Sequence, residues 1–163
     1  MVVKKIKEGI FQFSFGNFGS CVYLLDVRGM KILIDVSSGE NAEELKSDLS
    51  GLDVDVEDVY VVLITHRHWD HDGNLDLFSS AKVYDFENIG DFSLEGLEVF
   101  KVPGHTKDSL AFLFKGVLFS GDTMFHDGGI GRTDFEESVP EKMDESLELL
   151  RGLDYDVLCP GHI

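Results

Sequence analysis

Apolar runs separated by short polar or glycine-containing turns recur along most of this chain. In the first third, such runs occupy residues 10–15, 21–26 and 31–35, with turns at 16–19 and 27–29 between them. Strands joined by turns this short pair with their neighbours in antiparallel fashion. This part of the sequence therefore predicts an antiparallel meander.

Two longer stretches have apolar residues at helical spacing. The first covers about residues 42–52, and the second runs through Met143 and Leu147 to Leu150. Each follows a polar residue that has a glutamate three positions later, which is the sequence of a capping box. A short helix is also expected over residues 73–78. The predicted capping boxes are Asn41 with Glu44 and Ser138 with Glu141.

The remaining apolar runs predict further strands, and several of them end close to a side chain that binds metals. Strands followed by a helix, in two successive rounds, predict an α+β architecture. We expect two mainly antiparallel sheets packed face to face with helices outside, in a single domain over residues 1–163. The predicted strands are residues 59–64, 82–84, 97–102, 110–114, 117–120 and 157–159. Four of these strands are followed by a residue whose side chain can bind a metal, namely His66, His105, Asp122 and His162.

Three histidines and an aspartate lie within six residues, directly after the predicted strand at residues 59–64. In an extended segment, His66 and His68 point the same way and can bind one ion. Asp70 and His71 follow a turn and are expected to reach a second position. Solvated surface histidines are the alternative, but the chain has only six histidines, so a chance cluster is disfavoured. Imidazole and carboxylate ligands suit zinc, iron or manganese.

Four other residues have two possible roles each. Asp35 either holds a ligating histidine or caps a loop. Arg132 is expected to form a structural ion pair rather than to contact substrate. Trp69 is expected to be a packing anchor rather than a substrate platform. His126 lines a pocket or lies in a surface loop.

The net charge of the chain limits the classes of molecule that it is expected to bind. With 31 acidic and 14 basic residues, the net charge is −17. Such a surface repels nucleic acid and anionic membranes, whereas a bound metal would still admit a small anionic substrate. Neither a signal-peptide pattern nor an apolar run of transmembrane length is apparent, so a cytoplasmic protein acting on a small molecule is expected. Cys21 and Cys159 are expected to be free thiols, and the oligomeric state stays open.

The motifs around these candidates resemble, in order, the ligand set of the metallo-β-lactamase superfamily. They are residues 65–71 (THRHWDH), 103–106 (PGHT), 121–123 (GDT) and 160–162 (PGH). The resemblance implies an αββα sandwich and two divalent metal ions, with zinc expected first and iron or manganese as alternatives. The implied ligands are His66, His68 and His105 for one metal and Asp70, His71 and His162 for the other, with Asp122 bridging.

Within that superfamily, residues 119–125 and 129–135 resemble the glyoxalase II-like branch, which hydrolyses thioesters and includes short members without a C-terminal helical domain. The resemblance implies a dinuclear hydrolase in which metal-bound hydroxide attacks the thioester carbonyl. Asp70 and Asp122 are the expected catalytic carboxylates, chiefly as ligands. Because the sequence stops one residue after His162, weak turnover of glutathione thioesters is expected.

Other members of the superfamily are the alternatives. The iron-dependent persulfide dioxygenases share the Gly-Arg-Thr-Asp segment at residues 131–134, and their single metal would use His66, His105 and Asp122. A β-lactamase is disfavoured because no signal peptide is apparent. A nuclease is disfavoured by the net charge of −17.

Overall fold

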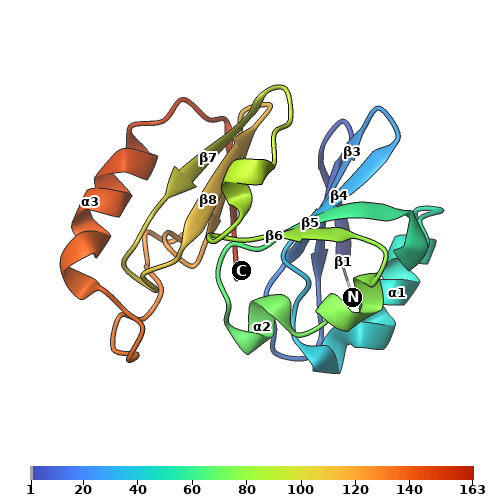
Figure 1. Cartoon of the computed structure of the whole chain (residues 1–163), viewed down its shortest axis with the longest axis horizontal. Coiled ribbons are helices and arrows are strands. Elements are labelled where there is room, and N and C mark those ends of the chain that lie inside the picture. Colours follow the sequence, from blue (N-terminus) through green and yellow to red (C-terminus); the bar gives the residue numbers. More distant parts are fainter. Residues whose placement is uncertain (1) are drawn as a thin grey trace. The chain divides into compact units, whose positions relative to one another are not determined.

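A computed structural model describes residues 2–163, which form two compact units, residues 2–84 and 85–163. Each unit contains one sheet with its own helices (Figure 1). The first unit contains strands β1 (Val2–Lys7), β2 (Ile10–Ser14), β3 (Val22–Val27), β4 (Met30–Ile34), β5 (Val59–Leu63) and β6 (Lys82–Tyr84), with helices α1 (Ala42–Ser50) and α2 (Trp69–Asp72). The second contains β7 (Leu97–Lys101), β8 (Leu110–Phe114), β9 (Val117–Gly121) and β10 (Val157–Pro160), with helix α3 (Pro140–Arg151).

The sheet of the first unit has the strand order β1-β2-β3-β4-β5-β6. The first four strands pair in antiparallel fashion, which confirms the predicted meander, and β5 is parallel to both of its neighbours. Strand β1 was not predicted, because this edge strand is mostly exposed and has three lysines among its six residues. An edge strand with lysines lacks the apolar run of an inner strand.

Helix α1 packs on this sheet through one apolar side. Leu45 and Leu49, four residues apart, are fully buried in the same cluster as Phe13 and Val62. Leu and Glu are good helix formers, and this spacing places both leucines on one face. The predicted helix is thus confirmed, although it ends at Ser50.

The predicted capping box at the start of α1 is wrong. The side chain of Asn41 makes no cap hydrogen bond. Its amide instead donates to the hydroxyls of Ser37 and Ser38, at 3.0 and 3.2 Å. Glu44 accepts a bond from the main-chain nitrogen of Gly16, at 3.4 Å. Both side chains therefore hold a neighbouring loop rather than the helix end.

Strand β5 leads directly into the histidine-rich segment. All of its residues except Tyr60 are buried, as expected for an inner strand with parallel partners on both sides. After the strand, α2 begins at Trp69, inside the ligand segment, and a 3-10 helix covers Leu75–Phe78. Of the short helix predicted over residues 73–78, the structure has the 3-10 helix at Leu75–Phe78, while α2 lies before that range and was not predicted.

The sheet of the second unit has the order β10-β9-β8-β7, with β9 and β10 parallel and the other pairs antiparallel. Helix α3 runs along this sheet (Figure 1). Its Met143, Leu147 and Leu150 are buried with Val102 and Leu118. Five of the eight strand pairings in the two sheets are antiparallel, as predicted.

The capping box predicted for α3 is also wrong. The helix begins at Pro140, and Val139 is the residue before it. Proline suits this first position because its missing N–H would have no partner within the helix. The hydroxyl of Ser138 donates to the main-chain oxygen of His105, at 2.7 Å.

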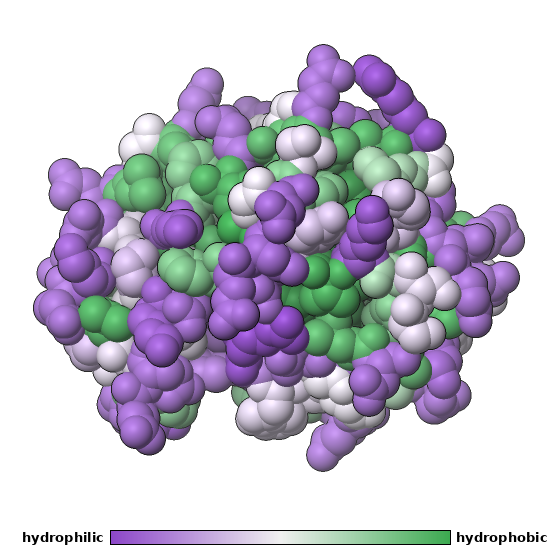
Figure 2. Space-filling model, viewed as in Figure 1, coloured by the Kyte–Doolittle hydropathy of each residue, from purple (hydrophilic) through white to green (hydrophobic). Residues whose placement is uncertain are grey.

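The surface matches the acidic composition. Hydrophilic side chains cover much of the face in Figure 2, with smaller apolar patches between them. Among residues 2–163, no helix has the length and apolar character needed to cross a bilayer.

Candidate metal centre

The first unit brings His66 and His68 together just beyond β5. Nε2 of His66 lies 3.1 Å from Nδ1 of His68, and the two rings meet edge to face. Two nitrogens that bind one tetrahedral zinc at ordinary bond lengths lie about 3.3 Å apart. The separation therefore fits two ligands of a single ion, as the spacing in the sequence predicted.

A buried hydrogen-bond network holds the rings of His66 and His71. The hydroxyl of Thr65 donates to Oδ2 of Asp35 at 2.8 Å and lies 3.0 Å from Nδ1 of His66. Nδ1 of His71 also lies 2.8 Å from Oδ2 of Asp35. We assign the proton of both rings to Nδ1, because the carboxylate and the hydroxyl accept there. Nε2 of both histidines then carries the lone pair that a metal needs.

Asp35 thus contacts a candidate ligand, which was the first of its two possible roles. The carboxylate is buried, and its other oxygen accepts from the main-chain nitrogen of Thr65 at 2.8 Å. The residue has a φ of +56°, a conformation that aspartate tolerates better than most residues. Asp35 therefore fixes both the strand end and the ring of His71.

Main-chain bonds place Asp70 and His71 on α2. The oxygen of Asp70 accepts from the nitrogen of Ser20, and that of His71 accepts from Val36, both at 2.8 Å. A side chain at Gly73 would lie 2.5 Å from the oxygen of Trp69, so only glycine lets the chain pass here. The ligand atoms of Asp70 and His71 lie within 4.8 Å of each other, and those of His66 and His71 do too.

The second unit gathers two candidate histidines around Asp122. Oδ2 of Asp122 lies 3.6 Å from Nε2 of His105 and 3.4 Å from Nε2 of His162. His105 follows β7, Asp122 follows β9 and His162 follows β10. One carboxylate oxygen therefore lies within 3.6 Å of two imidazole nitrogens.

The segment at residues 131–132 supports this cluster through its main chain. Nδ1 of His105 donates to the oxygen of Arg132 at 2.6 Å, which leaves Nε2 facing Asp122. The nitrogen of Gly131 donates to the oxygen of Asp122 at 2.8 Å. A side chain at Gly131 would lie 2.2 Å from that oxygen and 2.7 Å from Nδ1 of His105. His162 is placed by a bond from the nitrogen of Gly161 to the oxygen of Gly121, at 2.8 Å.

Three predicted roles outside the ligand set have clear outcomes. Arg132 forms a paired contact with Asp134 at 2.9 and 2.8 Å, which confirms the ion pair. This contact raises the pKa of Arg132 and lowers the pKa of Asp134, although both side chains are exposed. His126 is exposed in its loop. The packing role of Trp69 is wrong, because 61% of this residue is exposed.

Some supporting residues have no signal in the sequence. The contacts of His105 with the oxygen of Arg132 and with the hydroxyl of Ser138 involve main-chain atoms that any residue carries. Phe135 meets the ring of His105 edge to face, at 5.8 Å between centroids. Thr65 could have been proposed, since it directly precedes a candidate ligand and carries a hydroxyl.

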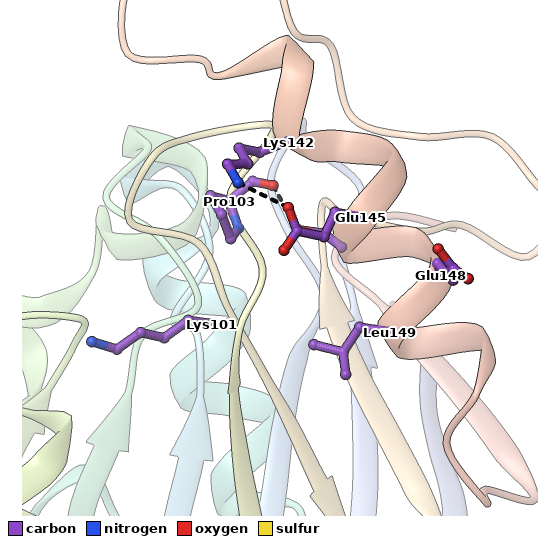
Figure 3. A pocket seen from close by; sticks show the side chains of 7 residues that line it. Lys101, Pro103, Lys142, Glu145, Glu148 and Leu149 are labelled. Carbon is purple, nitrogen blue, oxygen red and sulfur yellow. Dashed lines mark hydrogen bonds and ion pairs between the residues drawn. The ribbon is translucent and has the colours of Figure 1, made fainter.

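A separate pocket lies between the end of β7 and α3 (Figure 3). It has a volume of about 350 Å³ and contains none of the seven ligand candidates. Lys142 at its edge pairs with Glu145 at 2.9 Å, while Lys101 lies on the opposite side. Its mixed charges and apolar lining lack a converging ligand set, so the histidine and aspartate clusters remain the candidate site.

Comparisons with known proteins agree with the ligand pattern. A family model described as Metallo-beta-lactamase superfamily matches residues 16–85 and 83–162. Metallo-beta-lactamase domain-containing protein 1 of Xenopus laevis is 31% identical over 155 residues, which cover 82% of this chain and 66% of that protein. Hydroxyacylglutathione hydrolase of Halorhodospira halophila is 40% identical over 120 residues, covering 62% and 46%. The chain thus spans about half to two thirds of the length of these relatives.

Solved structures confirm the predicted fold class. A metallo-beta-lactamase family protein from Thermus thermophilus matches with a TM-score of 0.82 and 19% identity, over 98% of this chain and 75% of that chain. TTHA1623, solved in a di-iron-bound form, matches with a TM-score of 0.78 and 22% identity, over 94% and 92%. At these identities the likeness establishes the fold.

Proposed function

Because this chain belongs to the metallo-β-lactamase superfamily, we propose that it is a metal-dependent hydrolase of thioesters. The family supports metal-dependent hydrolysis in general. The 40% identity to a hydroxyacylglutathione hydrolase over 120 residues supports the narrower choice of a thioester. The net charge of −17 favours a small-molecule substrate over nucleic acid or an anionic membrane. A cytoplasmic location stays a prediction.

The observation that carries this proposal is the geometry within each unit. His66 and His68 are spaced as two ligands of one ion, and Oδ2 of Asp122 lies between two imidazole nitrogens. We propose that the two clusters share a pair of metal ions. One ion would be bound by His66, His68 and His105, the other by Asp70, His71 and His162, with Asp122 bridging. The donor set of imidazole and carboxylate fits zinc, with iron or manganese as alternatives.

Two such ions, when bound, lower the pKa of water and polarise a carbonyl oxygen, which are the two needs of thioester hydrolysis. The chain's own residues hold the ligands in position and can accept a proton. Asp35 and Thr65 hold the rings of His66 and His71 in one tautomer, which would leave Nε2 of each ring to bind an ion. The carboxylate of Asp70 can accept a proton in addition to ligating. No nucleophilic side chain is required.

Replacing the bridging carboxylate tests this function. Asp122→Ala removes the ligand common to both ions, so zinc content by elemental analysis should fall and hydrolysis of a panel of acyl thioesters should be lost. Asp134→Ala is the matched control, because that aspartate lies in the same unit, is exposed and pairs with exposed Arg132. Full zinc content and near-native turnover in Asp122→Ala would show that the bridging role is wrong.

The alternative function is persulfide dioxygenation with a single iron, and the segment at residues 131–134 favours it by resemblance. Metal content separates the two functions. One iron per chain, with oxygen uptake in the presence of glutathione persulfide and no thioester turnover, would replace the hydrolase proposal. Two zinc ions with thioester turnover and no oxygen uptake would exclude the dioxygenase.

A further inference from the structure

Two large aromatic side chains lie side by side in solvent within the first unit. Phe18, in the turn between β2 and β3, is 64% exposed, and Trp69, the first residue of α2, is 61% exposed. Their ring centroids are 5.7 Å apart, and the planes are tilted by 39°. Single exposed apolar residues are common, but two aromatic rings in contact form a patch that water solvates poorly.

The turn that carries Phe18 is held rigidly. Its main-chain oxygen accepts from the hydroxyl of Ser38 at 2.6 Å and from the amide of Asn41 at 3.4 Å. A side chain at Gly19 would lie 2.3 Å from the hydroxyl of Ser37, so the turn packs tightly on the loop beneath it. The exposed ring of Phe18 therefore projects from a fixed base, and binding a ligand there costs little ordering of the protein.

The same turn is tied to the ligand segment. The nitrogen of Ser20 donates to the oxygen of Asp70 at 2.8 Å. Trp69 lies between the candidate ligands His68 and Asp70 in the chain. The aromatic pair is thus fixed beside the proposed metal ligands of the same unit. A substrate whose carbonyl is held by those ligands would bring its adjoining group near the two rings.

The charges around the turn indicate what that group is. Glu44 places a carboxylate oxygen 3.4 Å from the main-chain nitrogen of Gly16, and Asp72 on α2 pairs with Arg67 at 3.5 Å. The net charge of −17 disfavours an anionic group at the surface, and the two exposed rings favour an apolar one. A neutral hydrocarbon chain or aryl group fits both conditions.

We propose that Phe18 and Trp69 form an apolar platform that binds the acyl chain of the substrate and selects longer, neutral acyl groups. This inference rests on the proposed hydrolase function and names the substrate class. Neither residue takes part in the chemical step. A chain lying on an open platform buries about half of its surface, so each added methylene should strengthen binding roughly twofold rather than the roughly fourfold of full burial.

Trp69 is the only tryptophan of the chain, so its fluorescence reports directly on the platform. The test titrates the full chain, metal-free and zinc-loaded, with non-hydrolysable S-(2-oxoalkyl)-N-acetylcysteamine thioethers that carry acyl chains of two to ten carbons. We expect a saturable fluorescence change whose Kd falls with chain length. In parallel, kcat/KM for the matching thioesters should rise with chain length.

Substitution of Phe18 makes the test specific. Phe18→Ala removes one ring without touching the main-chain bonds of the turn, so the Kd of the longest probe should rise about fivefold to tenfold and the dependence on chain length should flatten. Phe18→Tyr keeps the ring and should restore it. Tyr60→Ala, at another exposed aromatic of this unit, is the matched control and should leave the dependence intact.

The outcomes separate the platform from the function. Probe binding that depends on chain length and on Phe18, without thioester turnover, would support the platform and refute the hydrolase. Thioester turnover with no dependence on chain length or on Phe18 would support the hydrolase and overturn the platform. Tighter binding of acyl chains with a terminal carboxylate than of neutral chains of equal length would also overturn it.

Discussion

Asp35 offers a sharp test of how the first unit holds its ligands. Asp35→Asn keeps the size of the side chain, and asparagine tolerates the positive φ of this position. The oxygen that accepts from Thr65 and from His71, both at 2.8 Å, would be replaced by an amide group if the other oxygen keeps its bond to the nitrogen of Thr65. Donors would then face donors at this position.

The size of the effect follows from the role of such partners. Loss of a group that holds a ligating histidine weakens metal binding by about 10-fold to 100-fold, or about 1.4 to 2.8 kcal/mol. Because the carboxylate holds His71 directly and His66 through the hydroxyl of Thr65, both zinc ions should bind more weakly. Competition titration with a chromophoric zinc chelator measures the two affinities.

Asp53 provides the matched control. It has the same φ of +56° but is exposed, so Asp53→Asn changes a carboxylate in the same backbone conformation away from the ligands. This variant should bind zinc as the unaltered chain does. If Asp35→Asn also kept the unaltered affinity for both ions, the account of ring positioning by Asp35 would be refuted.

Two further predictions concern stability. Burial, and secondarily the charge of Glu44, raises the pKa of Asp48, so the folded state keeps this proton longer than the unfolded state and stability should fall as pH rises from about 4. Asp48→Asn should therefore raise the urea midpoint at pH 7 and weaken the pH dependence, and an unchanged midpoint and pH profile would contradict this. Gly131→Ala should cost about 1–3 kcal/mol of unfolding free energy in urea and weaken zinc binding, since a side chain would lie 2.2 Å from the oxygen of Asp122. Gly90→Ala, where a side chain meets open space, is its control, and equal effects of the two would contradict the clash.

The sequence predicted most of the fold because its signals there are local. The apolar run before His66 indicates an inner strand whatever surrounds it, and β5 lies there. The edge strand β1 escaped prediction because its exposed lysines resemble a polar terminus. The two capping boxes failed for another reason: Asn41 and Ser138 use their side chains to bind residues that are distant in the sequence or outside the helix.

The sequence predicted which residues form the candidate site, but it did not predict the contacts that hold them in position. The types of the candidate ligands and their spacing can be read from the sequence, so His66 and His68 could be predicted to bind the same ion, and the structure brings them together. The bond from His105 to the main-chain oxygen of Arg132 could not be predicted, because every residue carries such an oxygen. The exposure of Trp69 also depends on how the whole chain packs, and its aromatic character alone favoured burial.

The central claim is that the ligands of the two units share two metal ions that hydrolysis requires. Titration of metal-free protein with zinc, followed by turnover of a neutral acyl thioester at each addition, tests it most directly. We expect no turnover without metal and a rise that is complete at two equivalents, with His68→Ala and His162→Ala each binding one equivalent fewer. Turnover by the metal-free chain, or zinc binding that neither substitution changes, would contradict the account.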